Sequence, residues 1–122
     1  MSIRRVVPNI KSKRLDDSRA FYVDLLGFKV GMDMGFIVTL VSPSNPTAQI
    51  SLLRDEEVST TPYAHLSIEV ANVDEIHKRV IERGLKIIYP LTDEPWGVRH
   101  FCAADPNGTV LNVMSHLKVN SN

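Results

Sequence analysis

LDDSRAFYVDLLGF, residues 15–28, predicts a short amphipathic helix that ends at Gly27 and leads into a strand. The same plan returns in residues 73–85, VDEIHKRVIERGL, where Gly84 takes the place of Gly27. In each copy we expect an aspartate to cap the start of the helix and the glycine to end it. An apolar run precedes each helix and extended segments follow it. The repeat therefore predicts two copies of one unit, with a cleft between them.

Helical spacing indicates which side chains the two helices bury. The first helix is expected over residues 16–26 and the second over residues 74–83. The side chains that we expect in the core are Phe21, Leu25 and Phe28 from the first copy, and Val73, Ile76 and Val80 from the second.

Extended segments surround both helices. Residues 64–70 alternate strictly between apolar and polar, so that His65, Ser67 and Glu69 share one face. Residues 105–108, DPNG, favour a type I turn that joins strands 98–104 and 109–115 into an antiparallel pair. Further strands are expected at residues 3–11, 36–41, 48–53 and 85–89, and a loop at residues 91–97. Together with the strand that follows Gly27, these make eight strands, and eight strands and two helices in this order indicate an α+β fold.

The size and composition of the chain predict one domain over residues 1–122, because 43% of its residues are hydrophobic and can bury one core. We expect module one at residues 3–54, a linker at 55–62 and module two at 63–117.

Fourteen basic and fourteen acidic residues balance, which argues against a nucleic-acid or membrane partner. The single Cys102, expected to be buried, excludes an internal disulfide, and with no visible secretion signal it favours a cytoplasmic location.

Three segments in this order resemble the vicinal oxygen chelate superfamily: residues 18–22 (SRAFY), 25–28 (LLGF) and 105–108 (DPNG). That superfamily includes glyoxalase I, extradiol dioxygenases and bleomycin-resistance proteins, and residues 7–10 (VPNI) are most similar to the bleomycin-resistance branch. The resemblance covers residues 3–116. It implies two βαβββ modules that form a cupped mixed sheet, with the helices on its outer side, and it implies a homodimer.

The resemblance also implies four metal-ligand positions on the first and last strands of the modules. These positions fall on Val7, Ser51, His65 and Asn112. Valine cannot bind a metal, and serine and asparagine are weak ligands for a divalent transition metal. Because a catalytic metal needs about three protein ligands and an open position, His65 alone does not suffice. We therefore expect no metal and no other cofactor.

A mostly neutral cavity with a few hydrogen-bonding groups is expected instead. The residues that we expect to contact a ligand are His65, Trp96, Arg99, Asn112, Ser51 and Met114. Trp96 and Arg99 suit a planar or anionic organic molecule, because an indole ring stacks and a guanidinium pairs with negative charge. Structural roles remain open for both His65 and Trp96: a histidine satisfied by local polar groups, and a ring that anchors a loop.

These features favour metal-independent binding, including sequestration, of a small planar or amphipathic organic molecule, as in bleomycin-resistance-like proteins. The alternative is a metal-dependent lyase, isomerase or dioxygenase of the glyoxalase superfamily with an altered metal site at His65. A third reading is an interaction module with a vestigial cleft. The sequence contains no nucleophile elbow, phosphate-binding glycine loop or dinucleotide fingerprint. Since one fold hosts many chemistries, catalytic residues are not assigned.

Overall fold

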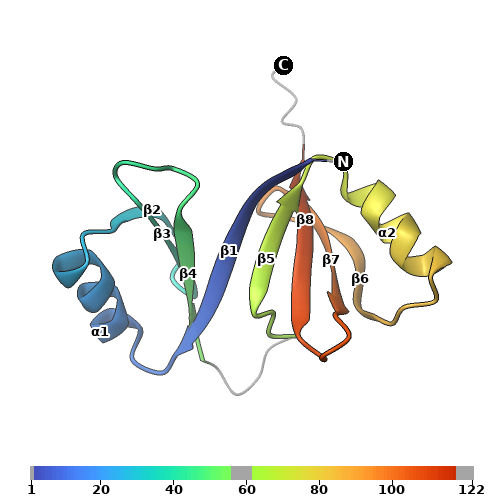
Figure 1. Cartoon of the computed structure of the whole chain (residues 1–122). Coiled ribbons are helices and arrows are strands. Elements are labelled where there is room, and N and C mark those ends of the chain that lie inside the picture. Colours follow the sequence, from blue (N-terminus) through green and yellow to red (C-terminus); the bar gives the residue numbers. More distant parts are fainter. Residues whose placement is uncertain (1, 56–61, 118–122) are drawn as a thin grey trace. The chain divides into compact units, whose positions relative to one another are not determined.

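The structure, a computed structural model, describes residues 2–55 and 62–117 (Figure 1). The chain divides into an N-terminal module, residues 6–60, and a C-terminal module formed by residues 1–5 and 61–122. Strand β1 (Ile3–Ser12) therefore contributes residues to both modules. Of the predicted linker, residues 56–61 lie outside the described residues. That the modules form one domain stays a prediction.

The N-terminal module follows the order strand, helix, three strands. After β1 come α1 (Leu15–Ala20), a π-helical segment η1 (Phe21–Leu25), β2 (Lys29–Asp33), β3 (Ile37–Val41) and β4 (Gln49–Arg54). Strand β1 pairs in parallel with β4, and β3 pairs antiparallel with both β4 and β2. The core of this module consists of Leu15, Val38, Leu40 and Leu52.

The C-terminal module repeats this plan. It contains β5 (Leu66–Val70), α2 (Val73–Glu82), β6 (Ile87–Glu94), β7 (Val98–Ala104) and β8 (Val110–His116). Strand β5 pairs in parallel with β8, and β7 pairs antiparallel with both β8 and β6. Its core consists of Val70, Val73, Phe101 and Val113, against which Ile76 and Val80 pack as predicted. The described residues thus form an open mixed sheet in an α+β fold of two βαβββ modules, which confirms the predicted fold class.

The predicted core face of the first helix is wrong in part. Phe21 is 51% exposed and Leu25 is 68% exposed, whereas Tyr22, Val23 and Phe28 pack against the core. The helix passes from α to π geometry at Phe21. Because a π turn closes over one more residue than an α turn, the side chains after Phe21 are rotated away from the spacing that the sequence suggests.

The predicted aspartate caps are also wrong. The first helix begins after Arg14, whose side chain makes no capping bond. The second begins after Asn72, whose Oδ1 accepts the N–H of Glu75 over 3.3 Å. Asp16 and Asp74 lie instead in the first turns, where a carboxylate still interacts favourably with the helix dipole.

The glycine ends of the helices are confirmed. Gly27 has a φ of +86° and Gly84 a φ of +68°, a left-handed conformation that glycine adopts without a steric penalty. The DPNG turn is confirmed as well, since the Gly108 N–H donates to the Asp105 carbonyl over 2.9 Å.

The loop predicted at residues 91–97 is wrong. Strand β6 continues to Glu94, and a tight turn at residues 95–97 leads directly into β7. The Gly97 N–H donates to the Glu94 carbonyl over 3.1 Å. The longer strand places Glu94 beside β7 rather than in a loop. No helix in residues 2–55 or 62–117 is long and apolar enough to cross a membrane.

Candidate functional site: a buried histidine on the C-terminal module

The strands of the C-terminal module place successive side chains on opposite sides of the sheet. Ile68, Phe101 and Val113 pack on the side of α2. The alternate positions lie on the other side, which we call the polar face. Its members on β5, β7 and β8 are Ser67, Glu69, His100, Cys102, Asn112 and Met114.

His100 is the centre of a hydrogen-bonded chain on this face. Its side chain is only 8% exposed, and its Nδ1 lies 2.7 Å from Asn112 Oδ1. Asn112 Nδ2 donates to Ser67 Oγ over 3.1 Å, so the amide oxygen is the atom that faces the imidazole. We therefore assign the proton to His100 Nδ1. In the neutral imidazole, Nε2 then carries a lone pair.

The Nε2 atom of His100 is buried and has no hydrogen-bond partner in the described part of the chain. Glu94 Oε2 lies 3.8 Å from it, which is too long for a hydrogen bond. The Glu94 side chain is itself only 11% exposed. Tyr89 Oη donates to Glu94 Oε1 over 3.4 Å, and the Tyr89 ring centroid lies 5.3 Å from that of His100. His100 Nε2 and Glu94 Oε2 thus lie 3.8 Å apart beside the ring of Tyr89.

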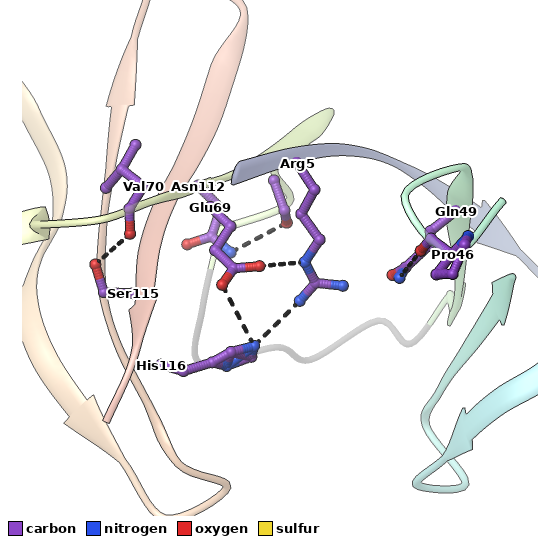
Figure 2. A network of polar contacts seen from close by, with 9 residues as sticks. Arg5, Pro46, Gln49, Glu69, Val70, Asn112, Ser115 and His116 are labelled. Atoms are coloured by element: carbon purple, nitrogen blue, oxygen red, sulfur yellow. Dashed lines mark hydrogen bonds and ion pairs between the residues drawn. The ribbon is translucent and has the colours of Figure 1, made fainter. Parts of the chain in front are cut away.

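A second polar cluster on this face joins β1 to β5 and β8 (Figure 2). Arg5 Nε pairs with Glu69 Oε1 at 2.5 Å, and Arg5 Nη2 lies 3.3 Å from His116 Nε2. The Arg5 and Glu69 side chains are only 22% and 15% exposed. The guanidinium of Arg5 therefore neutralises a carboxylate that is largely buried. The cluster therefore fixes the first residues of β1 to the C-terminal module.

The structure brings two of the predicted site residues together with His100. Asn112 bonds to its imidazole, and Met114 lies directly opposite it in the register of β7 and β8. His65 is exposed immediately before β5, and its ring centroid lies 5.1 Å from that of Tyr63. A ligand contact by His65 stays a prediction.

Arg99 lies on the side of α2, since it alternates with His100 on β7. Its Nε donates to Asp74 Oδ1 and its Nη1 to Asp93 Oδ1, each over 2.8 Å. These hydrogen bonds, first to Asp93 and then to Asp74, raise the pKa of Arg99. The guanidinium thereby ties the start of α2 to β6, and the structure does not bring it together with Asn112. Trp96 lies in the tight turn before β7 and is 47% exposed.

Ser51 belongs to the N-terminal module. It is 5% exposed and lies on the side of β4 away from the core residue Leu52. Its Oγ is 3.3 Å from Thr39 Oγ1 on β3. The cysteine of the chain, Cys102, is buried as predicted, and burial raises the pKa of its thiol to about 11.

The residues at the implied metal positions do not fit a transition metal. Val7 has no donor atom, and the Asn112 amide is already bonded to His100 and Ser67. Within residues 2–55 and 62–117, no group of three or more His, Cys, Asp or Glu side chains could hold a metal ion. The donor chemistry of these positions therefore supports no metal-dependent step.

His100, Glu94 and Tyr89 are the members of the site that the sequence reasoning missed. The signal for His100 was present, because the confirmed turn at residues 105–108 places β7 beside the strand of Asn112. Glu94 was missed because residues 91–97 were predicted to form a loop. A register shift in β6 on each side of Tyr89 also breaks the alternation that would have related Tyr89 to Glu94.

The chain matches a family model and is similar to several solved structures. A family model described as Glyoxalase/Bleomycin resistance protein/Dioxygenase superfamily matches residues 5–113. A search of curated proteins finds no match.

Several solved structures share the fold. A glyoxalase/bleomycin resistance protein/dioxygenase superfamily member from Vibrio splendidus 12B01 is 20% identical with a TM-score of 0.71, over 93% of this chain and 99% of that chain. A hypothetical protein from Bacillus halodurans C-125 is 19% identical with a TM-score of 0.74, over 100% of both chains. A protein described as an NAD-dependent benzaldehyde dehydrogenase from Legionella pneumophila is 26% identical with a TM-score of 0.71, over 91% of this chain and 98% of that chain.

Proposed function

Because this chain belongs to the glyoxalase/bleomycin resistance protein/dioxygenase superfamily, we propose that it binds a small planar or amphipathic organic molecule without a metal. The binding site is the polar face of the C-terminal module. The observation that supports it is the buried Nε2 of His100, which lacks a hydrogen-bond partner in the described residues. Leaving such an atom unpaired costs about 1–3 kcal/mol, and a hydrogen bond from a ligand would recover that cost.

The side chains around His100 suit such a molecule. The Tyr89 ring offers a flat apolar surface beside the imidazole. Met114, opposite His100 in the register, offers a flexible apolar side chain that adapts to different shapes. Asn112 holds the imidazole in one tautomer. His65 and Trp96 belong to the same module and stay in the proposal as predicted contacts. Ser51 belongs to the N-terminal module, and Arg99 is engaged by two carboxylates.

The role proposed for this binding is sequestration, as in a bleomycin-resistance-like protein. A metal-dependent lyase, isomerase or dioxygenase is not proposed, because the residues at the four implied ligand positions do not fit a metal. The dehydrogenase description of the Legionella protein is not carried over either, since this chain lacks a dinucleotide-binding fingerprint. One equivalent of transition metal in protein purified without a histidine tag, lost in His65→Ala, would instead support the enzyme.

We extend the proposal to a homodimer in the cytoplasm. Strand β2 is an edge strand whose five residues are all exposed, and a second chain could cover such an edge. The single cysteine fits a reducing compartment. Sedimentation should give twice the 13.7 kDa mass of the chain. A monomer at micromolar concentration would contradict the dimer.

The binding proposal is tested by screening planar and amphipathic compounds by calorimetry. His100→Ala should weaken each hit by at least about tenfold, which corresponds to roughly 1.4 kcal/mol. The matched control is His77→Ala, because the His77 ring packs against Phe101 on the side of α2. That control should leave affinity within about twofold. Hits whose affinity ignores His100→Ala would place the site elsewhere.

A further inference from the structure

The 3.8 Å separation between His100 Nε2 and Glu94 Oε2 indicates which kind of ligand atom could bind to both. When the imidazole is neutral and carries its proton on Nδ1 toward Asn112, its Nε2 is an acceptor. Glu94 Oε2, 3.8 Å away, is an acceptor as well when the carboxyl is ionised. Two acceptors cannot bond to each other, so the group that satisfies both must be a donor.

The spacing suits a single nitrogen. A donor placed at an ordinary hydrogen-bond distance of about 2.9 Å from each acceptor can span two atoms that lie 3.8 Å apart. An ammonium group has several N–H donors and can serve both acceptors at once. A carboxylate or a carbonyl in the same place would add a third acceptor to the two already present.

The charges around His100 also favour a ligand that carries a donor and a positive charge. On the polar face, Glu69 is matched by the guanidinium of Arg5. The ion-pair partner of Glu94 is the imidazole of His100, which is charged only when it is protonated. A positively charged ligand would therefore supply the counter-charge to a carboxylate that is only 11% exposed, and hydrogen bonds to charged groups are the stronger ones.

Tyr89 completes the site for a cation. Its hydroxyl donates to Glu94 Oε1 and so holds the other carboxylate oxygen toward His100. Its ring lies beside the imidazole, and the face of an aromatic ring attracts a cation within about 6 Å. The expectation of an anionic ligand relied on Arg99, whose guanidinium is bound by Asp74 and Asp93 on the side of α2.

We propose that the ligand is an organic cation whose N–H group binds between His100 Nε2 and Glu94 Oε2, with its apolar body against Tyr89 and Met114. This inference rests on the proposed function, because it names the chemical class of the molecule bound at the polar face. It assigns Glu94 as the residue that determines the charge preference.

The test uses three probes of one shape: 2-naphthylmethylamine, 2-naphthylmethanol and 2-naphthoate, measured by calorimetry at neutral pH on the full chain. The amine should bind at least about tenfold more tightly than the alcohol, and the naphthoate should bind most weakly. Glu94→Gln should reduce the difference between amine and alcohol to less than about threefold, because it removes the charge and keeps the shape.

Two further variants test whether the preference for the amine depends on Glu94 itself rather than on any nearby carboxylate or on the Tyr89 ring. Asp93→Asn removes a carboxylate from the neighbouring position, where it pairs with Arg99, and should leave the preference for the amine unchanged. Tyr89→Phe keeps the ring and removes the hydroxyl that holds Glu94, and should lower the preference without abolishing it. With histidine labelled by ¹⁵N, the amine should shift the Nε2 resonance of His100 in the folded protein.

The outcomes separate the two proposals. Equal binding of amine and alcohol, or a preference that survives Glu94→Gln, would overturn the cation inference and leave ligand binding intact. If the three probes fail and the wider screen yields only neutral or anionic ligands, the cation inference is again overturned. If neither the probes nor the screen yields a ligand, the proposed function fails with it.

Discussion

Asn112 Oδ1 accepts a hydrogen bond from His100 Nδ1 over 2.7 Å, although the two residues are not direct partners in the strand register. His100 lies opposite Met114, and Asn112 lies opposite Cys102. The bond is therefore diagonal across β7 and β8, and it selects the tautomer that turns the Nε2 lone pair toward Glu94. The chemistry of the polar face depends on this one amide.

Asn112→Ala should lower the free energy of unfolding by about 1–3 kcal/mol, because it removes the acceptor of the buried His100 Nδ1. Urea denaturation measures the change. Asn112→Asp is the comparison variant, since its carboxylate still accepts from Nδ1. In ¹⁵N spectra, His100 should keep its Nδ1 proton in the Asp variant and lose that bias in the Ala variant. An unchanged stability in Asn112→Ala would remove the amide from its central role.

Arg99→Ala should lower the midpoint of thermal unfolding, by less than Asn112→Ala does, because it cuts the link from α2 to β6 through Asp74 and Asp93. Solvent weakens these exposed ion pairs. Arg99→Lys should restore only part of the loss, since a lysine lacks the planar fork that serves both carboxylates. Ligand affinity should stay unchanged. A tenfold loss of affinity with unchanged stability would instead support the ligand contact expected from the sequence.

Gly27→Ala and Gly84→Ala should each lower the free energy of unfolding by about 1–2 kcal/mol, because both glycines have left-handed φ values. Among the residues that the structure describes, no atom apart from the local backbone and the adjacent residues lies within 4 Å of a Cβ added at either glycine, so the cost comes from the backbone conformation. Gly27 and Gly84 belong to different modules.

This pair also tests whether the chain is one domain. Trp96, the single tryptophan, lies in the C-terminal module and reports its unfolding by fluorescence. In a single cooperative domain, Gly27→Ala should shift the Trp96 transition as Gly84→Ala does. If Gly27→Ala leaves that transition in place, the modules unfold separately.

Cys102 should make the protein less stable at high pH. Burial raises the pKa of its thiol from an ordinary 9.0 to about 11, so between these values the folded state keeps a proton that the unfolded state loses. Its contribution is therefore complete below pH 9 and is lost as the pH rises toward 11. The loss should reach about 2–3 kcal/mol relative to Cys102→Ala, compared by urea denaturation at each pH. A difference that does not change with pH would contradict the buried neutral thiol.

The sequence determined those features that depend on neighbouring residues. Both helices, their glycine ends and the DPNG turn follow from local backbone preferences, and the alternation in residues 64–70 placed Ser67 and Glu69 on one face. The identities of Val7, Ser51 and Asn112 also showed that His65 is the one strong transition-metal ligand among the four implied positions. Local patterns failed where the backbone leaves regular geometry: at the π turn that exposes Phe21 and Leu25.

Only the tertiary structure decided how the site is assembled. Tyr89 and Glu94 would point to opposite sides of a regular strand, and the register shifts in β6 bring them to one carboxylate–hydroxyl contact. A ligand contact by Arg99 stays a prediction, and what the packing of α2 decided is that Asp74, distant in the sequence, lies at its guanidinium. Periodicity within one strand specifies which side a residue takes. Which residue faces it depends on pairing and packing between distant segments, and these gave His100 its burial and the contact of its Nδ1 with Asn112.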